Sequence, residues 1–252
     1  MNDPSPRVYL LDVEGTVAPV AFVYEHLFPY ARAHFRAFLE QNISVDAVIR
    51  DLILLRKEHK NEQDPNAPSL SETGGRTDKN NISWSLSNSI PQILDYLFWL
   101  MDRDRKSTAL KSLQGRIWKN GFESGQLQGT LFDDVPAAFE RWSAKARVAI
   151  YSSGSEEAQR LLFCYSIFGD LTGLISAYFD THVGPKQASA SYAAIARNLK
   201  VEPGEVLFLS DRVTELNAAR QAGCQTRLVV RDGNAPVEEG HGYEVVESFA
   251  VI

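Results

Sequence analysis

The stretch that decides the fold is Val8-Tyr9-Leu10-Leu11-Asp12-Val13-Glu14-Gly15-Thr16, in which an apolar run ends abruptly in acids and a glycine. The run is too short and too continuous for an amphipathic helix, and it predicts a buried strand of a parallel sheet. Gly15 and Thr16 indicate that the strand ends here and turns into a loop, so that Asp12 and Glu14 can reach one cavity. Open parallel sheets bind their ligands beyond the carboxyl ends of the strands.

Similar apolar runs recur further along the chain, each followed or preceded by a helical pattern: Val148–Ser152, Val206–Asp211 and Thr226–Val230. Strands that alternate with helices predict an α/β fold, with an open parallel sheet covered by helices on both faces. Most of these runs end in a polar or acidic residue, as the first one does.

The first two strands are separated by about 130 residues without a convincing strand, whereas a crossover between parallel strands needs only a dozen or more. An inserted domain is the economical explanation, and its patterns are helical: Val23–Gln41, Val45–His59, Ile90–Met101 and Arg105–Asn120. We expect a core of residues 1–18 and 128–252, with an all-helical insertion at 19–127. The polar stretch 61–81 is predicted to be a loop, and Gly121, Gly125 and Gly129 are predicted to form turns.

Composition excludes several classes of protein. The 26 Lys and Arg residues are outnumbered by 32 Asp and Glu, so the net charge of −6 gives no positive field to gather nucleic acid. The densest apolar stretch, residues 93–101, is interrupted by Asp95 and is too short to span a membrane. The first seven residues do not have the order of a signal peptide, and two distant cysteines indicate neither disulfides nor zinc. We expect a cytoplasmic protein with no nucleic-acid or membrane partner.

Asp12 and Glu14 are a natural pair of a nucleophile and a proton donor. An ionised Asp can accept a phosphoryl group, while a neighbouring carboxylic acid can give a proton to the leaving oxygen. The competing interpretation is a polar strand end followed by a loop acid, and the Asp-x-Glu pattern alone favours it.

Hydroxyl groups follow the second strand at Ser152 and Ser153, just before a helix. A hydroxyl and the free N–H groups of a helix N-terminus can bind phosphate oxygens. An ordinary N-cap formed by Ser153 or Ser155 is the alternative.

Asp211 ends another strand, and Glu215 follows at a spacing that places both on one face of a helix. If Asp12 and Asp211 face each other across adjacent strand ends, a cation such as Mg²⁺ is needed to relieve their repulsion. Helix capping by Asp211 is an equal alternative. Lys186 opens a helical run and can balance a nucleophile and an incoming phosphate, although a solvated lysine fits the local sequence as well.

The order of Asp12-x-Glu14, Ser152, Lys186 and Asp211 resembles that of the four motifs of the haloacid dehalogenase superfamily. Most phosphatases of that superfamily have Asp-x-Asp in the first motif, and Glu14 narrows the resemblance to the acireductone synthases, the bifunctional enolase-phosphatases of methionine salvage. Further stretches carry this closer resemblance over nearly the whole chain: Phe28-Pro29-Tyr30-Ala31-Arg32, residues 110–118, Tyr151-Ser152-Ser153-Gly154-Ser155 with Glu157-Ala158-Gln159, residues 207–211, and Arg231-Asp232-Gly233-Asn234-Ala235. Asp232 stands where the family usually has Pro.

The resemblance implies a Rossmann-like parallel sheet with a helical cap inserted after the first strand. It implies that Asp12 is the nucleophile and a Mg²⁺ ligand, that Glu14 gives its backbone carbonyl to the metal and its side chain to proton transfer, and that Asp211 completes the metal site. Ser152 and Ser153 would hold the substrate phosphate, and Lys186 would bind substrate and take part in catalysis. Glu215 is expected to orient a metal-bound water or Lys186.

The substrate implied by the resemblance is 2,3-diketo-5-methylthiopentyl-1-phosphate, a small phosphorylated diketone that is enolised and then dephosphorylated. We expect the protein to be a monomer. Glu14 is a candidate for the base of the first step, which the residues leave open. The alternative within the superfamily is a generic phosphomonoesterase without enolase activity. A haloacid dehalogenase needs neither a metal nor a second acid, and a phospho-accepting receiver module has no room for a helical insertion of about a hundred residues.

Overall fold

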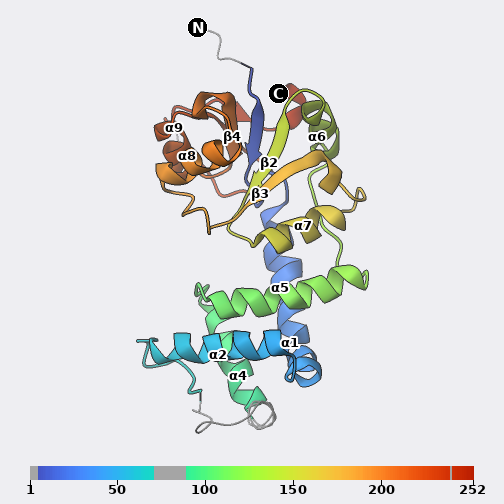
Figure 1. Cartoon of the computed structure of the whole chain (residues 1–252), viewed down its shortest axis with the longest axis vertical. Coiled ribbons are helices and arrows are strands. Elements are labelled where there is room, and N and C mark those ends of the chain that lie inside the picture. Colours follow the sequence, from blue (N-terminus) through green and yellow to red (C-terminus); the bar gives the residue numbers. More distant parts are fainter. Residues whose placement is uncertain (1–4, 71–88, 239) are drawn as a thin grey trace. The chain divides into compact units, whose positions relative to one another are not determined.

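The computed structural model describes residues 5–70, 89–238 and 240–252, which form two compact units (Figure 1). The core unit spans residues 1–26 and 124–252, and the helical unit spans residues 27–123. The helical unit is therefore an insertion into the chain of the core unit.

The core unit is built on a six-stranded sheet whose strands follow the order β3-β2-β1-β4-β5-β6 in the described part of the chain. Every neighbouring pair is parallel. The strands are β1 (Val8–Leu11), β2 (Arg147–Tyr151), β3 (Ile175–Phe179), β4 (Val206–Ser210), β5 (Gln225–Val229) and β6 (Val245–Val246). The strand order reverses between β1 and β4, which creates a topological switch point at the carboxyl end of β1.

Helices cover both faces of this sheet (Figure 1). They are α6 (Val135–Ser143), α7 (Glu156–Cys164), α8 (Ser189–Asn198) and α9 (Val213–Gln221), with short 3-10 turns η2 (Thr172–Leu174), η3 (Pro203–Glu205) and η4 (Phe249–Val251). Alternate residues of β1 face opposite sides: Leu10 joins the hydrophobic cluster of α8 and α9, whereas the Tyr9 ring stacks on Trp142 of α6 at 4.4 Å. Both faces of β1 are therefore buried, which explains why all four of its residues are apolar or aromatic.

The helical unit contains α1 (Phe28–Asn42), α2 (Asp46–Lys60), α4 (Ile90–Asp102) and α5 (Thr108–Glu123), preceded by the π-helical turn η1 (Phe22–Leu27). Their apolar faces form one cluster that includes Phe35, Leu97 and Leu113. The start of α5 is fixed by Glu58 of α2, because the backbone N–H groups of Thr108 and Ala109 donate to Glu58 Oε1 at 3.0 and 3.3 Å.

Most of the predicted elements are found in the structure. The four predicted strands and the four predicted helices are present, although Phe22–Leu27 is a π-helical turn rather than the start of α1. The short strands β3 and β6 were not predicted. The predicted turn at Gly121 is wrong, because this glycine is buried within α5, but Gly125 has a φ of +72° and does form a turn. Residues 61–70 of the predicted loop contain no helix or strand, and residues 71–81 lie outside the described residues.

The structure bears on two predictions made from composition, which concern the cysteines and membrane-spanning helices. Both cysteines are free, and Cys164 is partly exposed while Cys224 is buried. Within the described ranges, no helix combines the length and apolar character needed to cross a bilayer.

A partly buried ion pair fastens the loop after β5 to the rest of the core unit. Both terminal nitrogens of Arg231 donate to the Asp134 carboxylate at 2.9 Å, and Ser248 Oγ and Phe249 N also donate to it. Arg231 Nε in turn lies 3.4 Å from the carbonyl oxygen of Thr16. Burial raises the pKa of the Asp134 carboxyl, but the hydrogen bonds from Arg231, Phe249 and Ser248 outweigh burial, so this pKa lies below its ordinary value.

We predict that Asp134→Asn lowers the free energy of unfolding by about 2 kcal/mol at pH 7, because Arg231 loses a charged partner. Since the folded-state pKa of Asp134 lies below the ordinary value of 3.8, its stabilisation is complete above that pH and is lost as the pH falls through the folded-state pKa. The difference in the free energy of unfolding between wild type and Asp134→Asn should therefore become smaller below about pH 4. Urea unfolding at pH 7, 4 and 3 measures it.

The matched control is Asp133→Asn, which removes an exposed acid beside Asp134. It should change the free energy of unfolding by less than about 0.5 kcal/mol. A difference between wild type and Asp134→Asn that is the same at every pH would contradict the assignment of this stabilisation to the Asp134 charge.

Candidate active site

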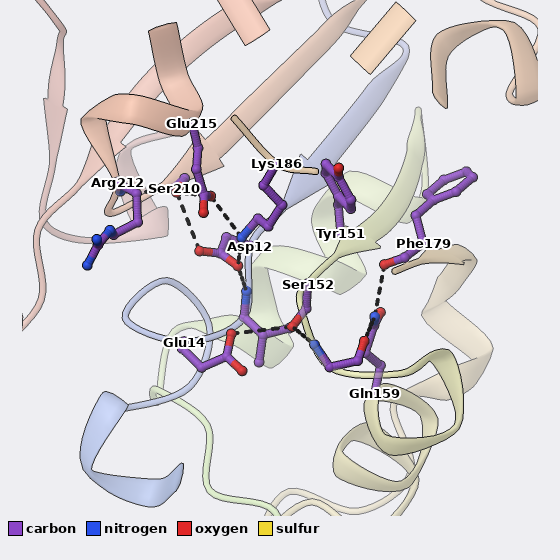
Figure 2. A network of polar contacts seen from close by, with 12 residues as sticks. Asp12, Glu14, Tyr151, Ser152, Gln159, Phe179, Lys186, Ser210, Arg212 and Glu215 are labelled. Carbon is purple, nitrogen blue, oxygen red and sulfur yellow. Dashed lines mark hydrogen bonds and ion pairs between the residues drawn. The ribbon is translucent and has the colours of Figure 1, made fainter. Parts of the chain in front are cut away.

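Asp12 lies at the switch point, immediately after the last residue of β1. Its backbone N–H donates to Leu209 O at 3.0 Å, which continues the pairing with β4. Asp12 is 3 % exposed, and its Oδ1 accepts hydrogen bonds from Val13 N at 2.7 Å and from Lys186 Nζ. Ser210 Oγ lies 3.4 Å from Oδ2. Asp12 is thus held in one orientation with Oδ2 as its less tightly bound oxygen (Figure 2).

Lys186 is a buried cation between two acids. Its Nζ contacts Asp12 Oδ1 and lies 2.8 Å from Glu215 Oε2, and the side chain is 6 % exposed. Burial opposes the charged form of this lysine, but Asp12 and Glu215 outweigh burial, so the pKa of Lys186 is raised. The alternative of a solvated lysine in the first turn of a helix is therefore wrong, since Lys186 precedes α8 and points inward (Figure 2).

Two tyrosine hydroxyl groups hold the segment that carries Lys186. Tyr192 of α8 donates to the carbonyl oxygen of Lys186, and Tyr151 of β2 donates to that of Gly184, both at 2.8 Å. The sequence analysis did not identify these tyrosines. Tyr151 ends a strand and Tyr192 lies one turn into a helix, and neither position indicates from the local sequence that the hydroxyl group binds a backbone carbonyl.

Glu14 meets Ser152 across the loops that follow β1 and β2. Ser152 Oγ donates to Glu14 Oε2 at 3.3 Å and accepts from Gly154 N at 3.1 Å. The turn that brings Glu14 there passes through Gly15, whose φ of +74° favours glycine. Burial, and then the charge of Asp12, raise the pKa of the Glu14 carboxyl. Glu14 is therefore able to hold a proton nearer to neutral pH than an ordinary glutamate.

Asp211 and Glu215 lie on the other side of Asp12. Burial, and then the charge of Asp12, raise the pKa of both carboxyls to about 7. Glu215 accepts a hydrogen bond from Ser210 Oγ at 3.0 Å in addition to its contact with Lys186. Asp211 does not cap α9, whose N-cap is Arg212 without a side-chain cap hydrogen bond, and its buried Oδ1 has no hydrogen-bond partner among the described residues.

Of the two predicted cap residues, Ser155 and not Ser153 is the N-cap of α7: its side chain accepts from Ala158 N at 3.2 Å. Ser152 is 1 % exposed and faces Glu14, whereas Ser153 is exposed on the same loop. The two predicted phosphate-binding hydroxyl groups therefore have different surroundings: Ser152 is buried against Glu14, and Ser153 is exposed.

Gln159 of α7 supports the loop that carries Ser152. Its Nε2 donates to Gly154 O at 2.8 Å and to Phe179 O at 2.9 Å, and thereby joins the ends of β2 and β3 (Figure 2). The sequence analysis gave Gln159 no role of its own. A glutamine one turn after the Ser155 cap is the feature that could have indicated one.

The donor set fits an oxygen-loving divalent cation. Four carboxylates gather here, from Asp12, Glu14, Asp211 and Glu215, while Lys186 supplies the buried positive charge. The raised pKa values and the unpartnered Asp211 Oδ1 indicate negative charge that the chain does not balance. No group of three or more His, Cys, Asp or Glu in the described ranges is arranged to hold a metal ion by itself. Mg²⁺ suits such a site, because it keeps several waters and takes one or two carboxylates.

Comparison with known proteins identifies the family. A protein-family model described as a haloacid dehalogenase-like hydrolase matches residues 6–223. The curated protein Enolase-phosphatase E1 of Synechococcus elongatus is 48% identical over 95% of this chain and 94% of its own length. Its namesake in Drosophila persimilis is 41% identical over 97% and 93%. The chain belongs to the enolase-phosphatase family of haloacid dehalogenase-like hydrolases.

Solved structures agree with this family assignment. The UTR4 protein of Saccharomyces cerevisiae superimposes with a TM-score of 0.75 at 35% identity, covering 98% of this chain and 100% of that one. A dehalogenase crystal structure with 20% identity and a TM-score of 0.55 shares the fold. Three predictions are thereby confirmed: the family, the α/β fold with a parallel sheet, and the phosphatase class of this enolase-phosphatase.

We predict that Lys186→Met lowers the free energy of unfolding of this enolase-phosphatase by about 3 kcal/mol at pH 7, because Asp12 and Glu215 stay buried without their cation. Urea unfolding measures the loss. The control Lys145→Met removes an exposed lysine before β2 and should leave stability nearly unchanged. A stability of Lys186→Met equal to that of the control would show that the lysine charge does not hold this cluster together.

Proposed function

We propose that this protein converts 2,3-diketo-5-methylthiopentyl-1-phosphate to the acireductone 1,2-dihydroxy-3-keto-5-methylthiopentene plus phosphate, in methionine salvage. The observation that carries the proposal is the pair formed by Asp12 and Glu14, in which a fixed nucleophile stands beside an acid of raised pKa. The relatives named Enolase-phosphatase E1 support the same reaction. One site then performs an enolisation followed by a phosphate-ester hydrolysis.

For phosphate release, Asp12 Oδ2 attacks phosphorus while the bond between phosphorus and the substrate oxygen breaks. Lys186 Nζ and Val13 N hold the other oxygen, so the attacking atom needs little reorientation. Glu14, with its raised pKa, gives its proton to the leaving oxygen and then takes a proton from the water that hydrolyses the aspartyl phosphate. Ser152 and Ser153 would hold the phosphate oxygens, with Gln159 fixing their loop.

For enolisation, a proton must leave a carbon next to a carbonyl group, and we propose Glu14 as the base. The hydrogen bond that Glu14 accepts from Ser152, a residue of the proposed phosphate-binding loop, supports this role. Burial makes its carboxylate a stronger base than an exposed glutamate. The same residue then serves proton transfer in both steps.

Asp12, Asp211 and the backbone carbonyl of Glu14 would hold Mg²⁺, the cation that fits the uncompensated charge described above. When bound, Mg²⁺ polarises a carbonyl group and neutralises charge on a transferring phosphoryl group. Glu215 lies against Lys186, and its role is to hold that ammonium toward Asp12.

The organisation of the protein is part of the proposal. We assign residues 1–18 and 128–252 to the catalytic core and residues 19–127 to a helical cap domain, which the helices of the inserted unit support. We expect a cytoplasmic monomer that acts on a small phosphorylated diketone. Size-exclusion chromatography and cell fractionation check the first two expectations.

The decisive experiment is a product analysis with the diketo phosphate and Mg²⁺ that follows the enediol chromophore and free phosphate together. Both should appear, and EDTA should abolish phosphate release. A simple aryl phosphate is the comparison substrate. Equal turnover of both esters without a chromophore would identify a generic phosphomonoesterase and refute the enolase step.

We predict that Asp12→Asn lowers the rate of phosphate release at least about 10³-fold, because the amide is a poor nucleophile. Phosphate detection under saturating Mg²⁺ measures the rate, and circular dichroism checks that the variant is folded. Retention of phosphate release in the folded variant would exclude Asp12 as the nucleophile.

We predict that Glu14→Gln lowers kcat about 10³-fold while KM changes less than about threefold, since Glu14 acts in the transition state. The glutamine oxygen can still accept the hydrogen bond from Ser152. Glu156→Gln, which removes an exposed acid at the start of α7, is the control and should keep wild-type kinetics. A change confined to KM would mean that Glu14 only binds substrate.

A further inference from the structure

Asn234 lies in the loop that follows β5, and the backbone of this loop is held by contacts outside the candidate active site. The Asn234 backbone N–H donates to Arg231 O at 3.1 Å and closes a turn. Arg231 is in turn held by Asp134 through two hydrogen bonds of 2.9 Å. The backbone position of Asn234 is therefore fixed.

The two ends of the Asn234 amide have different surroundings. Nδ2 donates to the carbonyl oxygen of Gly15 at 2.9 Å, and this contact determines the orientation of the amide, because two oxygens would repel each other there. Oδ1 points elsewhere, is buried, and has no hydrogen-bond partner in the part of the chain that the structure describes. A buried acceptor without a donor is costly.

Asp211 Oδ2 and Asn234 Oδ1 both lie beside Gly15. A Cβ placed on Gly15 would lie 2.7 Å from Asp211 Oδ2 and 2.9 Å from Asn234 Oδ1, so both acceptors approach the same point beside the Asp12–Thr16 loop. Asp211 Oδ1 is also buried and unpartnered among the described residues. Such a group of acceptors needs donors, and the chain offers none to Asp211 Oδ1 or Asn234 Oδ1 within the described residues.

We propose that Asn234 is a positioning residue of the cation site. Its Nδ2 holds the Gly15 carbonyl and thereby the loop that carries Asp12 and Glu14, while its Oδ1 accepts a hydrogen bond from a water of the hydrated Mg²⁺ that Asp211 binds. Waters in the shell of Mg²⁺ are strong donors, and groups that accept from them tune cation affinity. This inference rests on the Mg²⁺ site of the proposed function.

The test measures Mg²⁺ binding by isothermal titration calorimetry on the full chain, without substrate. Asn234→Ala removes both contacts and should weaken Mg²⁺ binding about tenfold. Asn234→Asp keeps an oxygen but loses the donor to Gly15, so it should bind Mg²⁺ at least as tightly as wild type while its Tm without Mg²⁺ falls. Asp232→Asn alters an exposed residue of the same loop and should match wild type in both measurements.

Two results would overturn the inference. The first is a Mg²⁺ affinity of Asn234→Ala equal to that of wild type. The second is an equal loss of Mg²⁺ affinity in Asn234→Ala and Asn234→Asp, which would mean that Asn234 only holds Gly15. If circular dichroism shows Asn234→Ala unfolded, Asn234→Ser replaces it with the same expected weakening. Turnover of the diketo phosphate by wild type is measured in parallel. Weaker Mg²⁺ binding by Asn234→Ala together with no turnover by wild type would support the inference and refute the proposed function.

Discussion

The contact of Lys186 with Asp12 and Glu215 is the interaction on which the rest of the site depends. The Lys186 ammonium group, at 6 % exposure, is stable in its charged form only because two carboxylates face it. The two carboxylates would repel each other if the ammonium group did not lie between them. This mutual dependence joins three segments that are distant in sequence: the end of β1, the segment before α8, and the first turns of α9. The cluster therefore fixes the orientation of the Asp12 carboxylate before any substrate arrives.

The scaffold explains why this cluster can form at all. A parallel sheet brings the carboxyl ends of all its strands to one edge, and β1 lies between β2 and β4, where the strand order reverses. Residues that follow β1, β2 and β4 are thus neighbours, although residues 12, 152 and 211 are far apart in the chain. Burial then makes the charges of these residues interact strongly, which is why Asp12 alters the pKa of Glu14, Asp211 and Glu215.

Sequence patterns predicted the parts of this fold that depend on local periodicity. The apolar runs of β1, β2 and β4 are clear, and β5 is marked by the apolar residues at its end. In contrast, β3 has the exposed Ser176 as its second residue, and β6 has only two residues. The motif order placed Asp12, Glu14, Ser152, Lys186 and Asp211 at strand ends or in loops, and these residues lie close together in the structure. The contacts made by Tyr192 and Asn234 could not be predicted, because each joins a side chain to a backbone carbonyl whose position depends on how the loops fold.

Gly15 shows how little free volume the family's chemistry leaves beside the nucleophile. Its backbone already has a left-handed conformation, and the space where a side chain would begin lies within 3 Å of an oxygen from Asp211 and one from Asn234. Even an alanine methyl group at this position would collide with these two oxygens. A natural variant that replaces residue 15 would therefore have to shift the loop after β1 or the two side chains that face it, even if every other motif stayed the same.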